Sequence, residues 1–213
     1  MTNCHLCLKR VNADIEMVIL IDIDDTIEYL CRTWCKWLNL KYGTNVKYRN
    51  ITNWDLSVFF PSLSRDQVYE PLHNANFWKI VPPMLDAIKY IKMLINEGNK
   101  VYLCTSTDYR NIRPKFEYVI QKYFPYISWN QVIVAANKQM IRGDILVDDA
   151  PHNLENGKYY KILMSAPHNK NYNAEKNGMI RVNSWREIYN TIHLIKQKRG
   201  KRYESNKTKR NKG

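Results

Sequence analysis

The chain has 213 residues, of which 45% are hydrophobic and 12% aromatic. This composition excludes a disordered protein and allows one good-sized core, or one core with a small inserted domain. No apolar run approaches the roughly 20 residues of a membrane span, and the first ten residues lack the apolar segment of a secretory signal. The cysteines form no even framework for disulfides, so we expect a cytoplasmic protein that does not contact membranes: Cys4, Cys7, Cys31, Cys35 and Cys104.

The formal net charge of +13 is concentrated at the C-terminal end. Residues 196–213 contain nine Lys or Arg and one acid, Glu204, so they carry +8 and leave +5 for the rest of the chain. Because this segment is almost without apolar residues, we expect it to be a disordered tail. Such a tail either makes weak contact with nucleic acid through its phosphates or only keeps the protein in solution.

Hydrophobic patterns predict an alternation of strands and helices along the chain. Five short apolar runs are typical of buried strands: 18–23, 100–106, 131–138, 144–151 and 159–165. Helical spacing of apolar residues predicts helices that end at Gly43, cover 81–98, include Phe116 to Tyr123, and close the chain over 183–195. This alternation predicts an α/β fold with a doubly wound, Rossmann-like parallel sheet covered on both faces.

Two of the predicted helices carry clear local signals. In the helix over 81–98, Pro83 is expected in the first turn, Gly98 at the end, and one apolar stripe along the axis: Leu85, Ile88, Ile91 and Ile95. In the closing helix, Ser184 stands three residues before Glu187, as in a capping box.

One interval is too long for a single strand–helix–strand unit. Asp22 and Thr105 are roughly eighty residues apart, where about thirty suffice. The excess lies mainly between Tyr42 and Ile80 and is rich in aromatic residues, so we expect a small helical cap over the carboxyl edge of the sheet. The predicted organisation is an N-terminal extension (1–16), an α/β core (17–29 and 81–195), the cap (30–80) and the basic tail (196–213).

Polar residues follow the predicted strands where each strand ends. They are Asp22 and Asp24, then Thr105 and Ser106, then Lys138, and finally Asp148 and Asp149. In a parallel sheet these ends lie on one edge, so the side chains can converge. Several carboxylates around one point repel each other unless a divalent cation lies among them, and oxygen ligands favour Mg²⁺.

Phosphoryl transfer is the chemistry that needs this set of groups. One carboxylate can attack phosphorus and form an aspartyl-phosphate. A second carboxylate, two residues further on, can protonate the leaving alkoxide and then deprotonate the incoming water. The cation, a lysine and a hydroxyl can orient the phosphoryl oxygens.

These motifs resemble those of the haloacid dehalogenase (HAD) superfamily of phosphotransferases. The strings that carry the resemblance are "DIDDT" (22–26), the strand end at Thr105, Lys138, and "DD" (148–149). Within the superfamily the chain is similar to the 5′(3′)-deoxyribonucleotidases, from Met17 to about Tyr189. Further support comes from "VYLCTS", "NFWKIVPPMLDAI", "ILVDDAPHNL", "APHNKNYN" and "RVNSWREI".

The resemblance implies a role for each residue of the predicted site. Asp22 would be the nucleophile and Asp24 the general acid and base. Mg²⁺ would be held by Asp22, Asp149 and the main-chain carbonyl of Asp24, with Asp148 in support. Thr105, Ser106, Lys138 and Lys115 would bind the phosphate. Asp25 stands where these nucleotidases usually have Gly, and we expect it to be solvated.

The same resemblance implies a nucleoside monophosphate substrate, deoxyribose or ribose, whose base stacks on aromatic residues of the cap. The candidates are Trp54, Phe77 and Trp78, and ordinary packing inside the cap is the alternative for each. The sequence leaves open the base, the position of the phosphate and a homodimer.

Other interpretations remain at this point. A receiver domain also gathers Asp, Thr and Lys on such a sheet, but its motifs follow another order. A phosphatase for nucleic-acid ends or sugar phosphates would share the mechanism. A non-catalytic, basic nucleic-acid-binding protein would depend on the tail instead. Finally, Cys4 and Cys7 have zinc-type spacing, and they could form a metal site with Cys31 and Cys35.

Overall fold

The computed structural model of the protein describes residues 15–210. Its centre is a six-stranded sheet in which every neighbouring pair of strands is parallel, in the order β3-β2-β1-β4-β5-β6. The strands are β1 (Val18–Ile21), β2 (Lys100–Thr105), β3 (Val132–Val134), β4 (Ile145–Asp148), β5 (Tyr160–Met164) and β6 (Met179–Val182). This order confirms the doubly wound parallel sheet. The sequence patterns missed β6, because this strand has only four residues and Arg181 interrupts its apolar pattern.

Both faces of the sheet are buried, as the apolar strands predicted. Ile19 and Ile21 of β1 belong to a core cluster that α5 (Leu85–Asn96) and α9 (Trp185–Arg210) complete. Leu20 points to the opposite face and packs in a second cluster with Leu154 of α8 (Pro151–Leu154). The two central strands, β1 and β4, therefore have no exposed residue.

The remaining helical segments on the core side connect the strands. They are α6 (Tyr109–Lys115), the π-helical turn η4 (Phe116–Ile120), α7 (Gln121–Tyr123), and the 3-10 turns η5 (Trp129–Gln131), η6 (Lys138–Met140), η7 (Pro167–Asn169) and η8 (Glu175–Asn177). Helix α5 begins at Leu85, after Pro83 rather than with it in the first turn. Leu85 is 77% exposed, so the predicted stripe is wrong at that position, and Ala87, Ile91 and Leu94 face the core instead.

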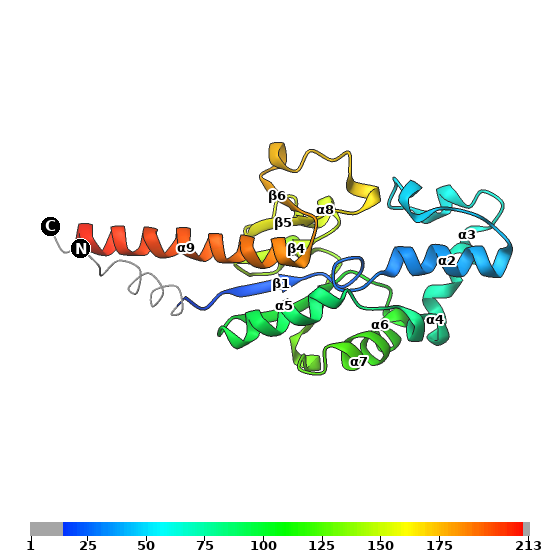
Figure 1. Ribbon diagram of the computed structural model, residues 1–213, viewed down its shortest axis with the longest axis horizontal. Helices are drawn as coiled ribbons and strands as arrows, with labels where there is room; N and C mark the ends of the chain where they lie inside the picture. The colour runs from blue at the N-terminus through cyan, green and yellow to red at the C-terminus, as the bar shows by residue number, and fades with distance from the viewer. Residues whose placement is uncertain (1–14, 211–213) are drawn as a thin grey trace.

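A helical cap lies between β1 and β2. It consists of α2 (Leu30–Tyr42), η1 (Tyr48–Asn50), η2 (Leu56–Phe59), α3 (Arg65–Tyr69), η3 (Glu70–His73) and α4 (Ala75–Ile80). The cap has its own apolar cluster, which includes Trp34, Phe60, Phe77 and Trp78. Gly43 ends α2 in the left-handed conformation that its position predicted (φ 67°). The cap helices gather at one end of the molecule (Figure 1). The predicted residue limits of the cap and core stay predictions.

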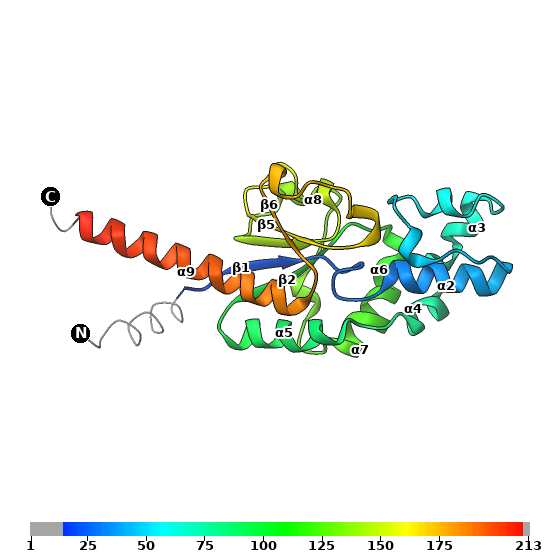
Figure 2. The ribbon, with the colours of Figure 1, turned by 45° about the horizontal axis from the view of Figure 1, so that its top comes forward.

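The predicted disordered tail is instead a continuation of the closing helix, because α9 extends through Arg210. The middle of α9 is held against the body: Lys196 is only 2% exposed, and Arg199 forms an ion pair with Asp144. Lys, Arg and Gln are good helix formers, and extending an existing helix avoids the cost of nucleation. Both views show this half of α9 projecting past the sheet at the end opposite the cap (Figures 1 and 2).

The start of α9 also fixes the turn after β1. Trp185 is 2% exposed, and its indole N–H donates to the main-chain carbonyl of Thr26 over 2.8 Å. One half of the predicted capping box is present, since Glu187 N donates to Ser184 Oγ over 3.3 Å. The Glu187 carboxylate accepts from Asn183 N rather than from Ser184.

Two other findings concern the sequence predictions. Among residues 15–210, no helix combines the length and apolar character needed to cross a membrane. Cys4 and Cys7 lie outside the described residues, so the predicted zinc site remains untested. Cys35 is buried, and its thiol donates a hydrogen bond to the main-chain carbonyl of Val46 over 3.0 Å.

Candidate active site

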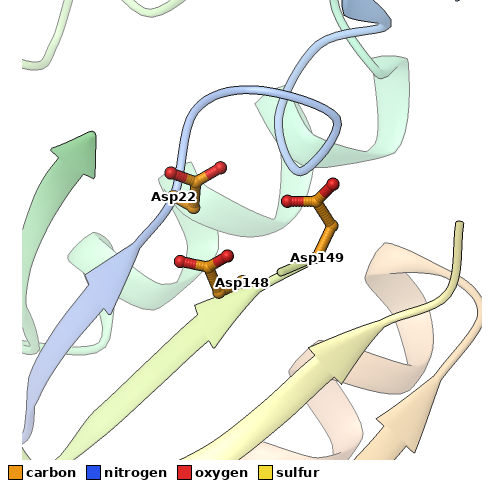
Figure 3. A group of neighbouring side chains, drawn as sticks. All are labelled: Asp22, Asp148 and Asp149. Atoms are coloured by element: carbon orange, nitrogen blue, oxygen red, sulfur yellow. The ribbon is translucent and has the colours of Figure 1, made fainter. Parts of the chain in front are cut away.

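Three aspartates meet at the carboxyl edge of the two central strands. Asp22 directly follows β1, Asp148 ends β4 and Asp149 follows it. Asp22 N donates to Val147 O over 2.9 Å, which keeps the two strand ends in register. One carboxylate oxygen from each aspartate lies within 4.8 Å of the others, and all three residues are at least 95% buried. Their side chains face a common space (Figure 3).

A buried lysine holds two of these carboxylates together. Lys138 begins η6 and is fully buried; its Nζ contacts Asp22 Oδ1 and lies 2.7 Å from Asp148 Oδ2. Burial alone would lower the pKa of Lys138, but the Asp22 and Asp148 carboxylates raise it above the ordinary lysine value. Lys138 therefore remains protonated, and it supplies the positive partner that buried acids require.

Asp148 and Asp149 have different surroundings although they are adjacent. Asp148 is fully satisfied: besides Lys138 it accepts from Ala150 N at 2.8 Å and from Asn153 Nδ2 at 3.1 Å. Neither oxygen of Asp149 has a hydrogen-bond partner among the described residues. His168 Nε2 lies 3.0 Å from Asp149 Oδ2, without the alignment of a hydrogen bond. Burial and the adjacent Asp148 raise the pKa of Asp149 well above its usual range.

This donor set fits a hard divalent cation. Asp149 offers two buried, unpartnered oxygens, and the Asp22 carboxylate lies beside it. Oxygen ligands of this kind are those that Mg²⁺ takes in proteins. Asp148 is less suited to act as a direct ligand, because its oxygens already accept several hydrogen bonds.

A second buried lysine lies beside Asp24. Lys115, the last residue of α6, is 1% exposed; its Nζ donates to Asp24 Oδ2 over 2.7 Å and to Thr105 Oγ1 over 3.2 Å. Asp24 Oδ1 has no hydrogen-bond partner in the described part of the chain. Lys115 thus orients one oxygen of Asp24 and leaves the other free. Ser106 is exposed at the edge of the same space.

The site opens into a cavity of about 450 Å³ between the sheet edge and the cap. Asp24, Asp25 and Ser106 line the cavity from the core, while Trp34 and Trp54 line it from the cap. A larger hollow of about 710 Å³ is bounded by Tyr29, Pro83 and Trp185, but none of the predicted site residues lines it. We therefore assign the smaller cavity to the candidate active site.

The three aromatic residues predicted to stack on a base are not equivalent. Trp54 lines the cavity, and its ring meets those of His168 and His152 edge-on, with centroids 4.9 and 5.6 Å away. Phe77 and Trp78 are instead at least 99% buried in the cap cluster and do not line the cavity, which favours the alternative of ordinary packing inside the cap. Trp78 does touch the site from behind, because the Lys115 Nζ lies 5.3 Å from the centre of its ring.

The structure also shows a polar cavity wall that the sequence patterns missed. Its members are Asn53, Arg65, Asp66, Tyr69, His73, Asp108, Arg110 and Asn111. Asp55 lies behind this wall and holds Tyr69 Oη at 2.9 Å and the Arg65 guanidinium at 3.2 Å. These residues belong to short helical turns and loops, which have no periodicity. The only available signal was the capping box of Ser64 and Gln67, which places the start of α3.

Asp25 and Glu28, next to the nucleophile motif, are both buried. Only Asp25 had been expected to be solvated. Asp25 is 7% exposed rather than solvated, and both its carboxylate oxygens accept from Cys31 N, at 3.2 and 3.1 Å. Glu28 is fully buried, and its carboxylate has no hydrogen-bond partner among the described residues. Burial, followed by the neighbouring Asp24, raises the pKa of Glu28 well above the usual value, which favours the neutral acid.

Comparisons with known proteins agree with this geometry. A family model described as "5' nucleotidase, deoxy (Pyrimidine), cytosolic type C protein" matches residues 16–199. The chain is 31% identical to the 5'(3')-deoxyribonucleotidase of Clostridium acetobutylicum over 170 residues, which cover 78% of this chain and 89% of that protein. It is 30% identical to the 5'(3')-deoxyribonucleotidase of Bacillus subtilis over 172 residues, covering 80% and 95%.

Solved structures share the fold at low sequence identity. A HAD family hydrolase from Deinococcus radiodurans with bound phosphate has a TM-score of 0.57 at 11% identity, over 85% of this chain and 97% of that one. A magnesium-bound protein described as a HAD-hydrolase from Bacillus subtilis has a TM-score of 0.52 at 12% identity, over 83% and 98%. These two matches support the architecture of sheet and cap.

Proposed function

The chain belongs to the family of the 5' nucleotidase, deoxy (pyrimidine), cytosolic type C protein, and from this premise we propose that it is a Mg²⁺-dependent nucleotidase. Its substrates are nucleoside monophosphates, deoxyribose or ribose, which it hydrolyses to nucleoside and phosphate. The observation that carries the proposal is the pairing of two acids with buried lysines, Asp22 with Lys138 and Asp24 with Lys115, beside Asp149 and next to a cavity that Asp24 lines. The word "cytosolic" in the family description supports a cytoplasmic location.

In the proposed reaction, Asp22 attacks the phosphorus atom and the ester P–O bond breaks, which leaves an aspartyl-phosphate. Asp24 gives its proton to the departing nucleoside oxygen, and the nucleoside leaves. Water then attacks the phosphorus of the aspartyl-phosphate while Asp24 takes the water proton back. Phosphate is released, and both aspartates return to their starting states. The free Oδ1 of Asp24 suits this exchange, since Lys115 fixes only the other oxygen.

Four side chains are proposed to hold the transferring phosphoryl group. Lys138 and Lys115 neutralise its negative charge, and the hydroxyls of Thr105 and Ser106 contact its oxygens. Thr105 Oγ1 already lies 3.2 Å from Lys115 Nζ, so both can address one oxygen. Lys138 also keeps Asp22 oriented, because it is anchored on the other side by Asp148.

Mg²⁺ would be held by the Asp22 and Asp149 carboxylates and the main-chain carbonyl of Asp24, with Asp148 supporting the site through Lys138. When bound, it would supply charge neutralisation for the phosphoryl oxygens. The unpartnered oxygens of Asp149 support this assignment. On the cap side, Trp54 is the proposed platform for the base, since it is an aromatic ring that lines the cavity and is 55% exposed.

The test is phosphate release from a panel of deoxy- and ribonucleoside 5′- and 3′-monophosphates, with Mg²⁺ and with a chelator. We expect Mg²⁺-dependent turnover that falls by at least about 10³-fold in Asp22→Asn, an increase of about 4 kcal/mol in the barrier. The matched control is Asp66→Asn, which removes an exposed acid of the cavity wall. It should keep the turnover number of the wild type within about threefold, because Asp66 lies on the cap rather than among the reacting groups.

Two results would contradict the proposal in different ways. Full turnover by Asp22→Asn, or undiminished turnover in chelator, would overturn the mechanism. Release from sugar phosphates or nucleic-acid ends, without release from any nucleotide, would keep the phosphatase chemistry and overturn the substrate.

A further inference from the structure

Asp25 connects the catalytic turn to the first cap helix. It is the fourth residue after β1 ends, and it lies three residues from Asp22 along the chain. Both of its carboxylate oxygens accept the N–H of Cys31, in the first turn of α2, at 3.2 and 3.1 Å. The residue in the capping position of α2 is Tyr29, which makes no side-chain capping bond in the described structure. Asp25 therefore satisfies a free N–H at this helix end in its place.

The backbone conformation and the burial of Asp25 both indicate that its contact with Cys31 N is a built feature of the fold. Its φ is 50°, a left-handed value that Asp and Asn adopt more easily than most residues. The residue is 93% buried, and a buried carboxylate is costly without compensation. The hydrogen bonds from Cys31 and the positive end of the α2 dipole offset part of that cost, although burial, followed by the nearby Asp149, still raises the pKa of Asp25 well above its usual value. A Gly in this position would adopt the backbone conformation freely but would leave α2 uncapped.

The orientation of α2 in turn determines the shape of the cavity. Leu30, Cys31 and Trp34 of α2 line it directly. The indole N–H of Trp34 donates to Val68 O over 2.6 Å, which ties α2 to α3. Helix α3 carries Arg65 and Tyr69 of the polar wall. A chain of direct contacts thus leads from Asp25, through α2, to the side of the cavity opposite the catalytic aspartates.

We propose that Asp25 is a positioning residue that holds the cap part of the polar cavity wall, which includes Arg65 and Tyr69 of α3, at the working distance from the catalytic aspartates. This inference rests on the proposed function and deepens it, because it assigns substrate affinity to a residue within the catalytic motif. Asp25 takes no part in the chemistry. Its loss raises the KM of substrates that contact the wall and leaves the KM of other substrates unchanged.

The experiment compares Asp25→Gly, Asp25→Asn and wild type on two substrates in saturating Mg²⁺. One substrate is the nucleoside monophosphate that the wild type turns over best. The other is p-nitrophenyl phosphate, whose small leaving group does not span the cavity. For Asp25→Gly we expect KM for the nucleotide to rise about tenfold with kcat unchanged, because α2 and the residues it positions lose their attachment to the catalytic turn. Its kcat for the nucleotide, and both constants for p-nitrophenyl phosphate, should stay within about threefold of wild type.

Asp25→Asn keeps one side-chain acceptor for Cys31 N and tolerates the left-handed backbone, so it should restore the nucleotide KM to within about threefold. This rescue separates positioning from a general loss of folding, which thermal melting of both variants would also reveal. An equal loss on both substrates would overturn the inference by placing Asp25 in the chemistry or in the metal site. An unchanged nucleotide KM in Asp25→Gly would overturn it as well. If wild type itself hydrolyses neither substrate, it is the proposed function that fails.

Discussion

The floor and the wall of the cavity are built in different ways. The floor is the group of charged residues at the carboxyl edge of the sheet, and these charges form fixed pairs: Lys138 with Asp22 and Asp148, and Lys115 with Asp24. The wall consists of short helical segments and loops, and its charged side chains are more exposed: that of Arg65, which pairs with Asp55 behind the wall, is 72% exposed. The sheet therefore fixes the geometry of the reacting groups, whereas local turns shape the surface that faces the rest of the substrate. Under the proposed function, the floor would set the chemistry and the wall would set the substrate specificity.

Removing the buried cation of the floor should have the largest effect. Lys138→Met leaves Asp22 and Asp148 buried without their positive partner, so we expect a loss of about 3–5 kcal/mol in the free energy of unfolding. Phosphate release should be abolished at the same time. Urea denaturation and a phosphate assay would measure both effects.

The matched control is an ion pair on the outside of the cap. Lys41 Nζ lies 2.7 Å from Glu70 Oε2, but the two side chains are 42% and 41% exposed. Lys41→Met should therefore cost no more than about 1 kcal/mol and leave turnover unchanged. If Lys138→Met and Lys41→Met lowered the free energy of unfolding equally, the contrast between buried pairs in the floor and exposed pairs on the cap would be refuted.

An intermediate effect is expected where the cap touches the floor. Trp78→Phe keeps an aromatic ring in the cap cluster but removes the 2.7 Å hydrogen bond from Nε1 to Leu72 O and weakens the contact with Lys115. We expect a loss of about 1–3 kcal/mol by urea denaturation. Trp54→Phe, at a position 55% exposed, should cost less than about 0.5 kcal/mol. A larger cost at Trp54 would show that the cavity wall is part of the folding core.

The smallest effect concerns pH and metal. Burial raises the pKa of Asp22 and of Asp149 well above the usual value, and neighbouring carboxylates add to the increase. Such groups stabilise the fold fully below their unfolded pKa of about 4, and they lose this contribution as pH rises through the folded pKa. In chelator, the free energy of unfolding should therefore fall as pH is raised from about 4.

Mg²⁺ should restore this lost stability, by about 1.4 kcal/mol at ten times its Kd, and should do so more at pH 8 than at pH 5. Urea denaturation at both pH values, with Mg²⁺ and with chelator, measures the difference. Asp149→Asn is the control and should remove most of the Mg²⁺ effect. Stability that rises with pH in chelator would contradict the assignment of the buried acids.

The floor was predictable from the sequence because it obeys a simple constraint. Polar residues at the ends of buried parallel strands must meet at one edge, and buried acids need cations, so Asp22, Asp148 and Lys138 could be placed together before the fold was known. The roles assigned to them remain predictions. The wall had no such constraint, since Arg65 and Tyr69 belong to short turns whose direction no periodicity indicates.

The errors at other positions have the same origin. The sequence showed that Phe77 and Trp78 are aromatic residues of the cap, but not which way they point inside it. Asp25 was expected in solvent because its partner, Cys31 N, is a main-chain group without a sequence signal. The end of α9 was judged by its charge and its lack of apolar residues, whereas Lys196 is buried against the body and Arg199 forms an ion pair with Asp144.

The central place of β1 in the sheet has a kinetic consequence. Its backbone is hydrogen-bonded to β2 on one side and β4 on the other, and Asp22 N continues that ladder. Amide hydrogens in such a strand exchange with solvent only when the whole domain unfolds, while those of short surface turns exchange through local opening. We therefore expect the slowest-exchanging amides to lie next to the nucleophile and fast-exchanging ones to lie in the wall. The wall can then rearrange locally many times without any unfolding of β1.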